Sequence, residues 1–521
     1  MKSNISIIFS LVVVTVLMTS CFGDLDIKPM GPSIATATTA YNSPEAYKQG
    51  LAKLYATFAL SGQRGPAGSP DIAGIDEGFS NYLRQYWNCQ ELTTDEAVLS
   101  WNDATIKDLH WHTWSASDVF IGAVYSRIMY TVSLCNEYIR VTASNTDAEI
   151  MRYHAEARFL RALAYYHALD MFGNPPFITE EQLPGLFSPV QISRADLFAY
   201  IDSELSTIEP ALGAPRFEYA RADKGACWML QAKLYLNAQA YTGTSKYTEC
   251  ITAVKKILGA GYTLATNYLQ NFTADNNTSP EMIFPITFDG AYTQSYGGMV
   301  YLVHAPIGGS MPPLTMFGVA GGWGGLRTTS AFVGKFEDTS GNTDQRALFW
   351  TDKQTLEIND IGQFGEGYAI TKFRNLKLDG SPAEHPDPDF VDTDYPMFRL
   401  ADAYLMLAEA VLREGSGSSR AEALGLINAL RQRAYGNASG NIADNQLTLQ
   451  FVLDERAREL YWEGHRRTDL IRFGQFTGGA YLWPWKGNVA QGKSTEAFRD
   501  LFPIPSADRG ANTTLIQNDG Y

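Results

Sequence analysis

The chain has 521 residues, of which 45% are hydrophobic and 12% are aromatic, and its formal net charge is −15. This length is enough for one large domain or for several, with a sizeable hydrophobic core. The acidic balance argues against a nucleic-acid partner, because duplex binding draws most of its affinity from basic residues that meet phosphates. Neutral or cationic ligands fit this composition better.

The N-terminus has the pattern of a bacterial lipoprotein signal. A charged start is followed by the apolar run 5–18 and by small residues that lead to Cys21. The run is too short for a membrane span, and a cysteine at this point resembles a lipobox, in which the thiol is lipidated after cleavage. Met18 departs from the pattern, since leucine is commoner three residues before the cysteine. We predict a signal peptide over residues 1–20, lipidation of Cys21, and a lipid-anchored tether over residues 21–39.

After the tether, amphipathic blocks alternate with irregular stretches. The helical spacing of apolar residues predicts helices over Pro44–Leu60, Asp118–Val141, Asp147–Met171, Ser193–Ile208, Arg221–Tyr241, Lys246–Leu258, Arg399–Glu414, Ser419–Ala434 and Leu447–Gly464.

Two longer segments, residues 224–258 and 399–434, share one pattern. In each, a helix with alanine and leucine at helical spacing breaks at glycine, serine or threonine and resumes as a second amphipathic helix. Each unit spans about 34 residues, the length of a tetratricopeptide unit. We predict a mainly α-helical scaffold of tetratricopeptide-like pairs over about 40–263 and 397–521; a generic array of helical hairpins is the alternative.

Residues 264–396 have a different composition, with glycine, proline, aromatic residues and short β-like runs such as Met282–Phe288. We predict that this stretch is a loop-rich insertion with short β-hairpins within a single domain of residues 40–521. Loops on a rigid scaffold commonly carry function, so we expect the ligand surface here.

The insertion contains the stretch AGGWGGLR, in which Trp323 lies between two glycine pairs. A phosphate-binding loop needs small residues that let backbone N–H groups close on the anion, and a central indole would block this approach. Glycines on both sides instead free the backbone to present the ring as an exposed aromatic platform. A core tryptophan on a bulged strand is the alternative.

Two groups of polar residues could carry chemistry near residue 100. Glu91, Asp95 and Glu96 could supply the two carboxylates of a glycosidase, but in an acidic protein such residues are usually solvated or structural. His110 and His112 would share a face only on a strand, and no third ligand stands at metal spacing. We therefore predict neither a hydrolytic pair nor a metal site.

Two charged segments lie closer to the C-terminus. Asp387, Asp389, Asp392 and Asp394 could hold calcium, although the segment lacks the glycine and terminal glutamate of an EF-hand, and a solvated acidic loop is favoured. Residues 454–476 combine an apolar stripe with many arginines and acids, which predicts internal ion pairs over an anion site. The cysteines after Cys21 form no CxxC pair and are expected to be buried free thiols.

Three segments resemble the SusD/RagB family of outer-membrane nutrient-binding lipoproteins: residues 155–177, 454–476 and 501–521, which occur in the family's order. The resemblance implies a mostly α-helical protein exposed on the cell surface. It also implies that the protein caps a TonB-dependent, SusC-like transporter and delivers glycans to it. The first two segments would then determine the fold and not contact the ligand.

Shorter stretches are similar to a starch-binding member of the family, in which two tryptophans and a tyrosine cradle a helical sugar chain, aided by an arginine and a polar side chain. The matching positions are Trp101, Tyr301 and Trp323 for the aromatic arc, Arg84 for the arginine, and Asn102 or Asp103 for the polar contact. This resemblance implies binding of starch or malto-oligosaccharides without catalysis. Binding of another glycan, a purely structural lid on the transporter, and a glycan hydrolase are the alternatives.

Overall fold

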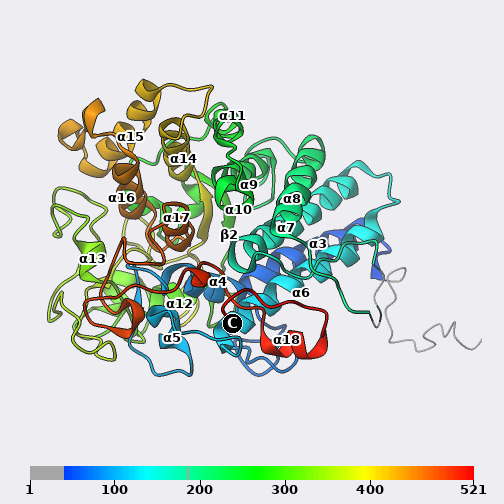
Figure 1. Ribbon diagram of the computed structural model, residues 1–521, viewed down its shortest axis with the longest axis horizontal. Helices are drawn as coiled ribbons and strands as arrows, with labels where there is room; N and C mark the ends of the chain where they lie inside the picture. Colours follow the sequence, from blue (N-terminus) through cyan, green and yellow to red (C-terminus); the bar gives the residue numbers. More distant parts are fainter. Residues whose placement is uncertain (1–39, 183–184, 186) are drawn as a thin grey trace, which may run out of the picture. The chain divides into compact units, whose positions relative to one another are not determined.

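The computed structural model describes residues 40–521, apart from residues 183–184 and 186 (Figure 1). The predicted signal peptide, tether and lipidated Cys21 lie outside the described residues. The chain divides into a short N-terminal unit that ends at Gly50 and a large unit, Leu51–Tyr521. Helix α3 (Pro44–Ala59) begins in the first unit and ends in the second.

The prediction of a mainly α-helical fold is confirmed. The helices expected from apolar periodicity are α3, α6 (Val119–Thr142), α7 (Ala148–Phe172), α8 (Arg194–Ile208), α9 (Lys224–Leu236), α10 (Ala238–Thr242), α11 (Tyr247–Leu258), α14 (Leu400–Leu412), α15 (Arg420–Tyr435) and α16 (Leu449–Leu460). The segment expected to form one helix from Arg221 to Tyr241 is divided, because Asn237 adopts φ −93° and ψ 1° between α9 and α10.

Further helices follow no clear apolar periodicity in the sequence. They are α4 (Tyr82–Glu91), α5 (Ile106–Trp111), α12 (Gly298–His304), α13 (Ser330–Val333), α17 (Arg466–Arg472) and α18 (Ser506–Ala511). Nearly every side chain of α4 and of α12 is buried, so neither helix has the polar face that makes a pattern readable.

Side-chain caps set the starts of the two longest helices. The carboxylate of Asp118 accepts hydrogen bonds from the backbone N–H groups of Phe120 and Ile121, and Asp147 caps α7 in the same way. Each cap satisfies donors that have no partner within the helix and contributes about 1 kcal/mol. The helices therefore begin one residue after the predicted aspartates.

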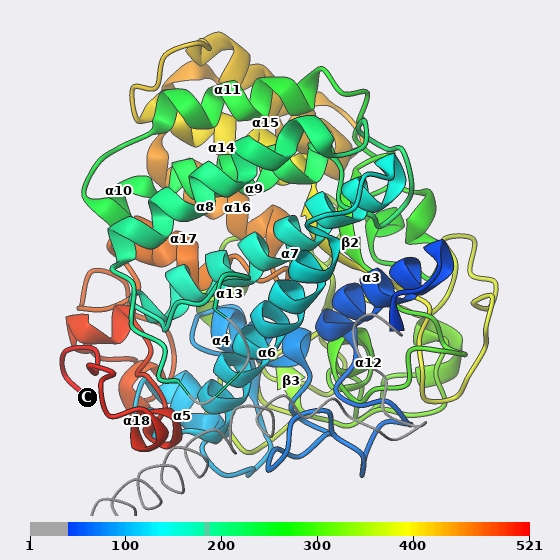
Figure 2. The same ribbon diagram turned by 90° about the vertical axis from the view of Figure 1, so that its right-hand side faces the viewer.

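The helices pack in pairs, as predicted. α6 lies along α7, α9 packs against α11, and α14 packs against α15 (Figure 2). α11 also packs against α14, although more than 130 residues separate them in sequence. The helical stack therefore continues across the insertion, which leaves it after α11 and returns to it at α14.

A pair of antiparallel strands closes the base of the insertion. β2 (Met282–Ile286) lies in the predicted β-like run and pairs with β6 (Tyr395–Arg399), so that Met282 faces Arg399. The register shifts on both sides of Phe284, next to Pro285, which cannot donate a ladder hydrogen bond.

Two shorter strand pairs lie elsewhere in the large unit. β4 (Phe349–Trp350) pairs with β5 (Ala369–Ile370) inside the insertion. β1 (Val98–Leu99) pairs with β3 (Leu326–Arg327), which joins the insertion to the segment after α4. The β4–β5 pair is a short pairing within the insertion, as expected, whereas β1–β3 and β2–β6 join segments far apart in sequence. Strands this short are stable only within a packed framework.

Buried ion pairs hold the base of the insertion to α16. The side chain of Arg399, at the end of β6, is 1% exposed. Its Nη1 lies 2.7 Å from an oxygen of Glu459 and 3.1 Å from one of Glu281, and its Nε lies 2.6 Å from Glu463. The predicted internal pairing of segment 454–476 is confirmed here.

The cysteines after the tether are buried free thiols, as predicted: Cys89, Cys135, Cys227 and Cys250. Burial raises the pKa of the Cys135 thiol to about 12. Among the helices of residues 40–521 that the structure describes, none has the length and apolar character needed to cross a membrane.

We predict that Arg399→Met lowers the free energy of unfolding by about 3 to 5 kcal/mol, because it leaves buried carboxylates without their partner. The control is Lys255→Met. Lys255 pairs with Glu422, and both side chains are more than a third exposed, so this change should cost less than about 1 kcal/mol. Urea unfolding measures both variants. Equal losses for the two would contradict a special role for the buried pairs.

Candidate functional site

The pairing of β1 with β3 brings Trp101 and Trp323 together. The backbone N–H of Ser100 donates to the carbonyl of Gly325 at 3.0 Å, which extends the strand contact toward Trp101. The indole N–H of Trp101 donates to the carbonyl oxygen of Trp323 at 3.1 Å. The ring centroids lie 6.2 Å apart with 45° between the planes. Two predicted site residues from distant segments thus form one surface.

The glycines around Trp323 are required by close packing. A Cβ atom on Gly325 would lie 2.6 Å from the indole of Trp101, and one on Gly322 would lie 2.2 Å from the carbonyl oxygen of Ile307. Both approaches are closer than real Cβ contacts allow. Positions 322 and 325 therefore require glycine, because a side chain there would overlap Ile307 or Trp101. This steric requirement adds to the backbone freedom that glycine provides.

Trp323 is half-buried, so it is neither a core residue nor a fully exposed platform. The imidazole of His304 stacks against its indole with centroids 5.1 Å apart and 19° between the planes. His304 is itself held by the carbonyl oxygens of Gly321 and Asp389, at 2.8 and 2.9 Å. The indole is thus fixed from one face and keeps part of its surface in solvent.

The prediction that Tyr301 belongs to the aromatic arc is wrong. Tyr301 lies in α12, is 0% exposed and packs edge-on against Trp87 and Trp101. Its ring therefore cannot stack on a ligand that arrives from solvent. It packs against the indole of Trp101 from the protein interior.

Tyr296, and not Tyr301, provides the exposed tyrosine ring next to Trp323. It precedes α12, is 37% exposed, and its ring centroid lies 6.4 Å from that of Trp323 with 81° between the planes. Phe390 stacks on it at 6.2 Å and 21°. The sequence did offer a signal, since Tyr301 lies in an unbroken apolar run whereas Tyr296 stands between Ser295 and a glycine pair.

Arg84 joins the two tyrosines. Its guanidinium carbon lies 4.4 Å from the ring centroid of Tyr301, and its Nη1 donates to the backbone carbonyls of Gly78 and Tyr296 at 3.3 and 3.1 Å. Its Nε is buried and has no hydrogen-bond partner among the residues described. Arg84 thus lies beside the rings of Tyr301 and Trp101 and fixes the loop that carries Tyr296, while its contact with a ligand stays a prediction.

The structure separates the two candidates for the polar contact, Asn102 and Asp103, which are both exposed. The side-chain oxygen of Asn102 accepts a hydrogen bond from Lys107. Burial lowers the pKa of Arg84, and the negative charge of Asp103 acts in the opposite direction, so this carboxylate is near enough to interact electrostatically with the guanidinium. Asp103 is therefore the better placed of the two.

The carboxylates weighed as a hydrolytic pair are structural. Glu91, Asp95 and Glu96 are each at most 1% exposed. Glu91 accepts from the backbone N–H of Gly464 at 2.6 Å, and Asp95 pairs with Arg466 at 2.7 Å. None of the three faces solvent or the aromatic surface.

The two histidines considered for zinc are also structural. Both are 2% exposed. The ring nitrogens of His110 lie 3.2 and 3.1 Å from the carbonyl oxygens of Leu92 and Pro484, and His112 is held by Thr93 and Thr495. Burial lowers the pKa of His110 to about 4 and that of His112 to about 3, so both rings are neutral at ordinary pH.

The acidic loop uses its carboxylates mainly to hold backbone. Asp387 accepts from the N–H groups of Asp389 and Phe390, and Asp394 accepts from the N–H of Phe288 and the hydroxyl of Tyr219. A different group brings potential ligand atoms within 4.8 Å of one another: Asp289, His385 and Asp392. Both oxygens of Asp392 already accept from backbone N–H groups at 2.8 Å. Calcium binding thus stays an untested alternative to the favoured solvated acidic loop.

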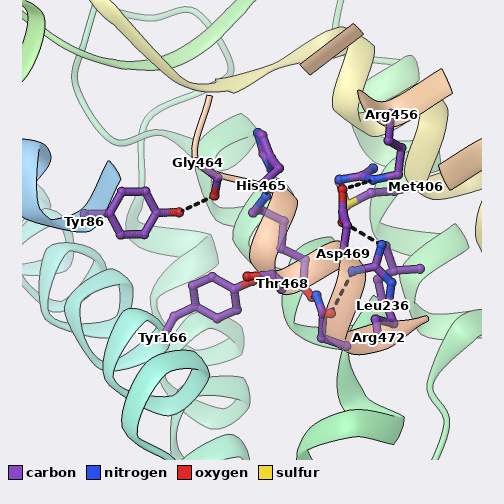
Figure 3. Close-up of a pocket in the computed structure, with 12 residues that line it drawn as sticks. Tyr86, Tyr166, Leu236, Met406, Arg456, Gly464, His465, Thr468, Asp469 and Arg472 are labelled. Carbon is purple, nitrogen blue, oxygen red and sulfur yellow. Dashed lines mark hydrogen bonds and ion pairs between the residues drawn. The ribbon is translucent and has the colours of Figure 1, made fainter. Parts of the chain in front are cut away.

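A polar pocket in the helical stack, shown in Figure 3, is too small for a sugar. It lies beside the ion pairs of Asp469 with Arg456 and Arg472 and beneath the hydroxyl of Tyr86, which donates to Gly464. Its volume is about 10 Å³, enough for at most one water molecule.

Comparison with known proteins identifies the family. The SusD family model matches residues 275–521. The starch-binding protein SusD of Bacteroides thetaiotaomicron is 38% identical over 567 aligned residues, which cover 99% of this chain and 98% of that protein. The chain belongs to the SusD family.

Solved structures share the fold. Surface glycan-binding protein A from Bacteroides fluxus aligns with a TM-score of 0.71 and 20% identity over 92% of this chain and all of that one. The protein of the same name from Bacteroides thetaiotaomicron, in complex with laminarihexaose, aligns with a TM-score of 0.69 and 18% identity over 91% and 99% of the two chains. These similarities confirm the SusD-like, mainly α-helical fold.

We predict that Gly325→Ala displaces the indole of Trp101 and costs about 1 to 3 kcal/mol of stability, because the added methyl group overlaps the ring. The indole N–H resonance of Trp101 should shift as its hydrogen bond to Trp323 is lost. The matched control is Gly321→Ala, whose Cβ would meet no atom within 4 Å. An unchanged Trp101 signal in Gly325→Ala would refute the packing argument.

Proposed function

We propose that the protein binds starch and malto-oligosaccharides at the cell surface without cleaving them and passes them to a SusC-like TonB-dependent transporter. The observation that carries this proposal is the aromatic arc, which we define as Trp101, Trp323 and Tyr296. These residues are joined at centroid distances of 6.2 and 6.4 Å and are each partly exposed.

The arc suits the apolar faces of a curved sugar chain. A glucose ring has a C–H face that packs on an indole or a phenol. The planes turn by 45° between Trp101 and Trp323 and by 81° between Trp323 and Tyr296, so the arc is not flat. A curved, fixed set of rings loses little entropy on binding a helical polymer and matches a flat chain such as cellulose poorly.

The polar edge of the sugar would meet Arg84 and Asp103. Hydroxyl groups both donate and accept hydrogen bonds, and a guanidinium and a carboxylate together supply donors and acceptors. Arg84 is held by the backbone of Gly78 and Tyr296, so it would not need to be ordered by the ligand.

The choice of starch is supported by the full-length relative that is named a starch-binding protein, at 38% identity. A protein that was solved in complex with laminarihexaose shares the fold at 18% identity. Laminarin is therefore the first alternative glycan to test. We further propose binding without turnover and without a cofactor. Burial of Glu91, Asp95 and Glu96 in ion pairs and hydrogen bonds supports the first part.

The cellular setting of the proposal comes from the sequence. Lipidation of Cys21 would anchor the protein in the outer membrane, and the tether of residues 21–39 would space the domain from it. Delivery to a SusC-like transporter is the role that family membership suggests. A lid that serves the transporter without binding glycan is the competing hypothesis.

We predict that Trp323→Ala weakens binding to amylopectin about tenfold or more, because it removes the central ring of the arc. Affinity electrophoresis in gels with and without amylopectin, laminarin or cellulose measures the effect. The control is Trp228→Ala, which removes a half-buried tryptophan of α9 that bonds to Glu209 on the helical scaffold. Unretarded migration of the wild type in amylopectin would disprove starch binding, and new reducing ends after incubation would disprove the absence of turnover.

A further inference from the structure

A second pocket lies beside the glycine-rich loop. It has a volume of about 200 Å³, and its lining includes Ser310, Trp350, Asp352, Lys353 and Phe364. Its walls combine two aromatic rings with charged and hydroxyl-bearing side chains, which is also the composition of the arc and its polar edge.

The fold directs Trp350 toward this pocket. Successive side chains of a strand point to opposite faces, and Phe349, itself half-buried, packs edge-on against the buried rings of Phe332 and Phe336. Trp350 therefore points away from these rings. It is half-buried, and its indole N–H donates to the hydroxyl of Ser310 at 3.3 Å, which fixes the ring.

The pocket lining approaches the loop that carries Trp323. A Cβ atom on Gly308 would lie 2.6 Å from the ring of Phe364 and 3.0 Å from the Cα of Gly324, the residue after Trp323. Ser310 follows Gly308 by two residues, so its Cα lies within about 12 Å of Gly324, since consecutive Cα atoms are about 3.8 Å apart. A chain of a few sugars can cover such a separation.

The polar side of the pocket is exposed and held in place. Asp352 and Lys353 are both exposed. Lys353 adopts φ +58°, a left-handed conformation that costs free energy for a residue with a side chain. The hydroxyl of Ser310 donates to the backbone carbonyl of Asp352 at 3.3 Å. This bond links residues 352–353 to Ser310, which also lines the pocket.

We propose that this pocket is a second subsite for the same glucan chain and binds one sugar residue beyond those on the arc. The sugar would stack on the ring of Trp350 and hydrogen-bond to Lys353 and Asp352. This inference rests on the proposed function, since it needs a glucan already seated on the arc. It makes affinity depend on chain length.

The test compares a short and a long ligand by calorimetry, with maltotriose and maltoheptaose as probes. Trp350→Ala should weaken maltoheptaose binding about two- to tenfold, the range expected for one lost stacking contact, and leave maltotriose binding unchanged. Trp350→Phe keeps a ring and should bind maltoheptaose more tightly than the alanine variant. Trp228→Ala serves as the control and should bind both probes as the wild type does.

The outcomes separate this inference from the proposed function. If wild type binds both probes and Trp350→Ala binds them equally well, or loses both to the same extent, the second subsite is wrong while the arc stands. If Trp350→Phe binds no better than Trp350→Ala, stacking at this pocket is wrong. If wild type binds neither probe, the proposed function fails and the subsite fails with it.

Discussion

The buried ion pair between Asp95 and Arg466 positions both halves of the candidate site. Arg466 lies at the start of α17, and its Nε is 2.7 Å from the carboxylate of Asp95, three residues before β1. The backbone carbonyl of Asp95 also accepts a hydrogen bond from the hydroxyl of Thr329, two residues after β3. The two strands that present Trp101 and Trp323 are therefore fixed at the same point.

Further buried ion pairs hold α16 and the turn that follows it. Glu455, Glu459 and Glu463 face arginines and a lysine from the insertion and from α15, all of them buried. Buried charges tolerate the loss of a partner poorly, so these segments can adopt few alternative arrangements. A rigid base under the loops gives the arc a fixed curvature before a ligand arrives, which lowers the entropic cost of binding.

Much of the scaffold could be predicted from the sequence because its helices are long, amphipathic and capped. Asp118 and Asp147 cap helices of 24 and 25 residues, and a helical signal of this length survives without knowledge of tertiary contacts. Trp323 could also be singled out, because glycines on both sides free the backbone to expose the ring, although the stretch alone left a core position as the alternative. The resemblance to a starch-binding relative then supplied Trp101 and Arg84, which the structure places beside it.

The remaining features depend on contacts between distant segments. The pairing of β1 with β3 involves two residues on each side, too few for any local pattern to reveal. The exposure of Tyr296 and the burial of Tyr301 follow from α12, which starts between them and packs against α4. Helical periodicity gives no answer here, because α12 is buried on every side. The only sequence signal is local: Tyr301 lies in an apolar run, whereas Tyr296 stands between a serine and a glycine pair.

The central claim is that a glucan chain lies on Trp101, Trp323 and Tyr296. A crystal structure of the protein with bound maltoheptaose tests it most directly. We expect glucose rings stacked on these three side chains, with Tyr301 buried beneath them and Arg84 hydrogen-bonded to the sugar edge. An oligosaccharide bound at another surface, with the arc in contact with solvent alone, would contradict the account.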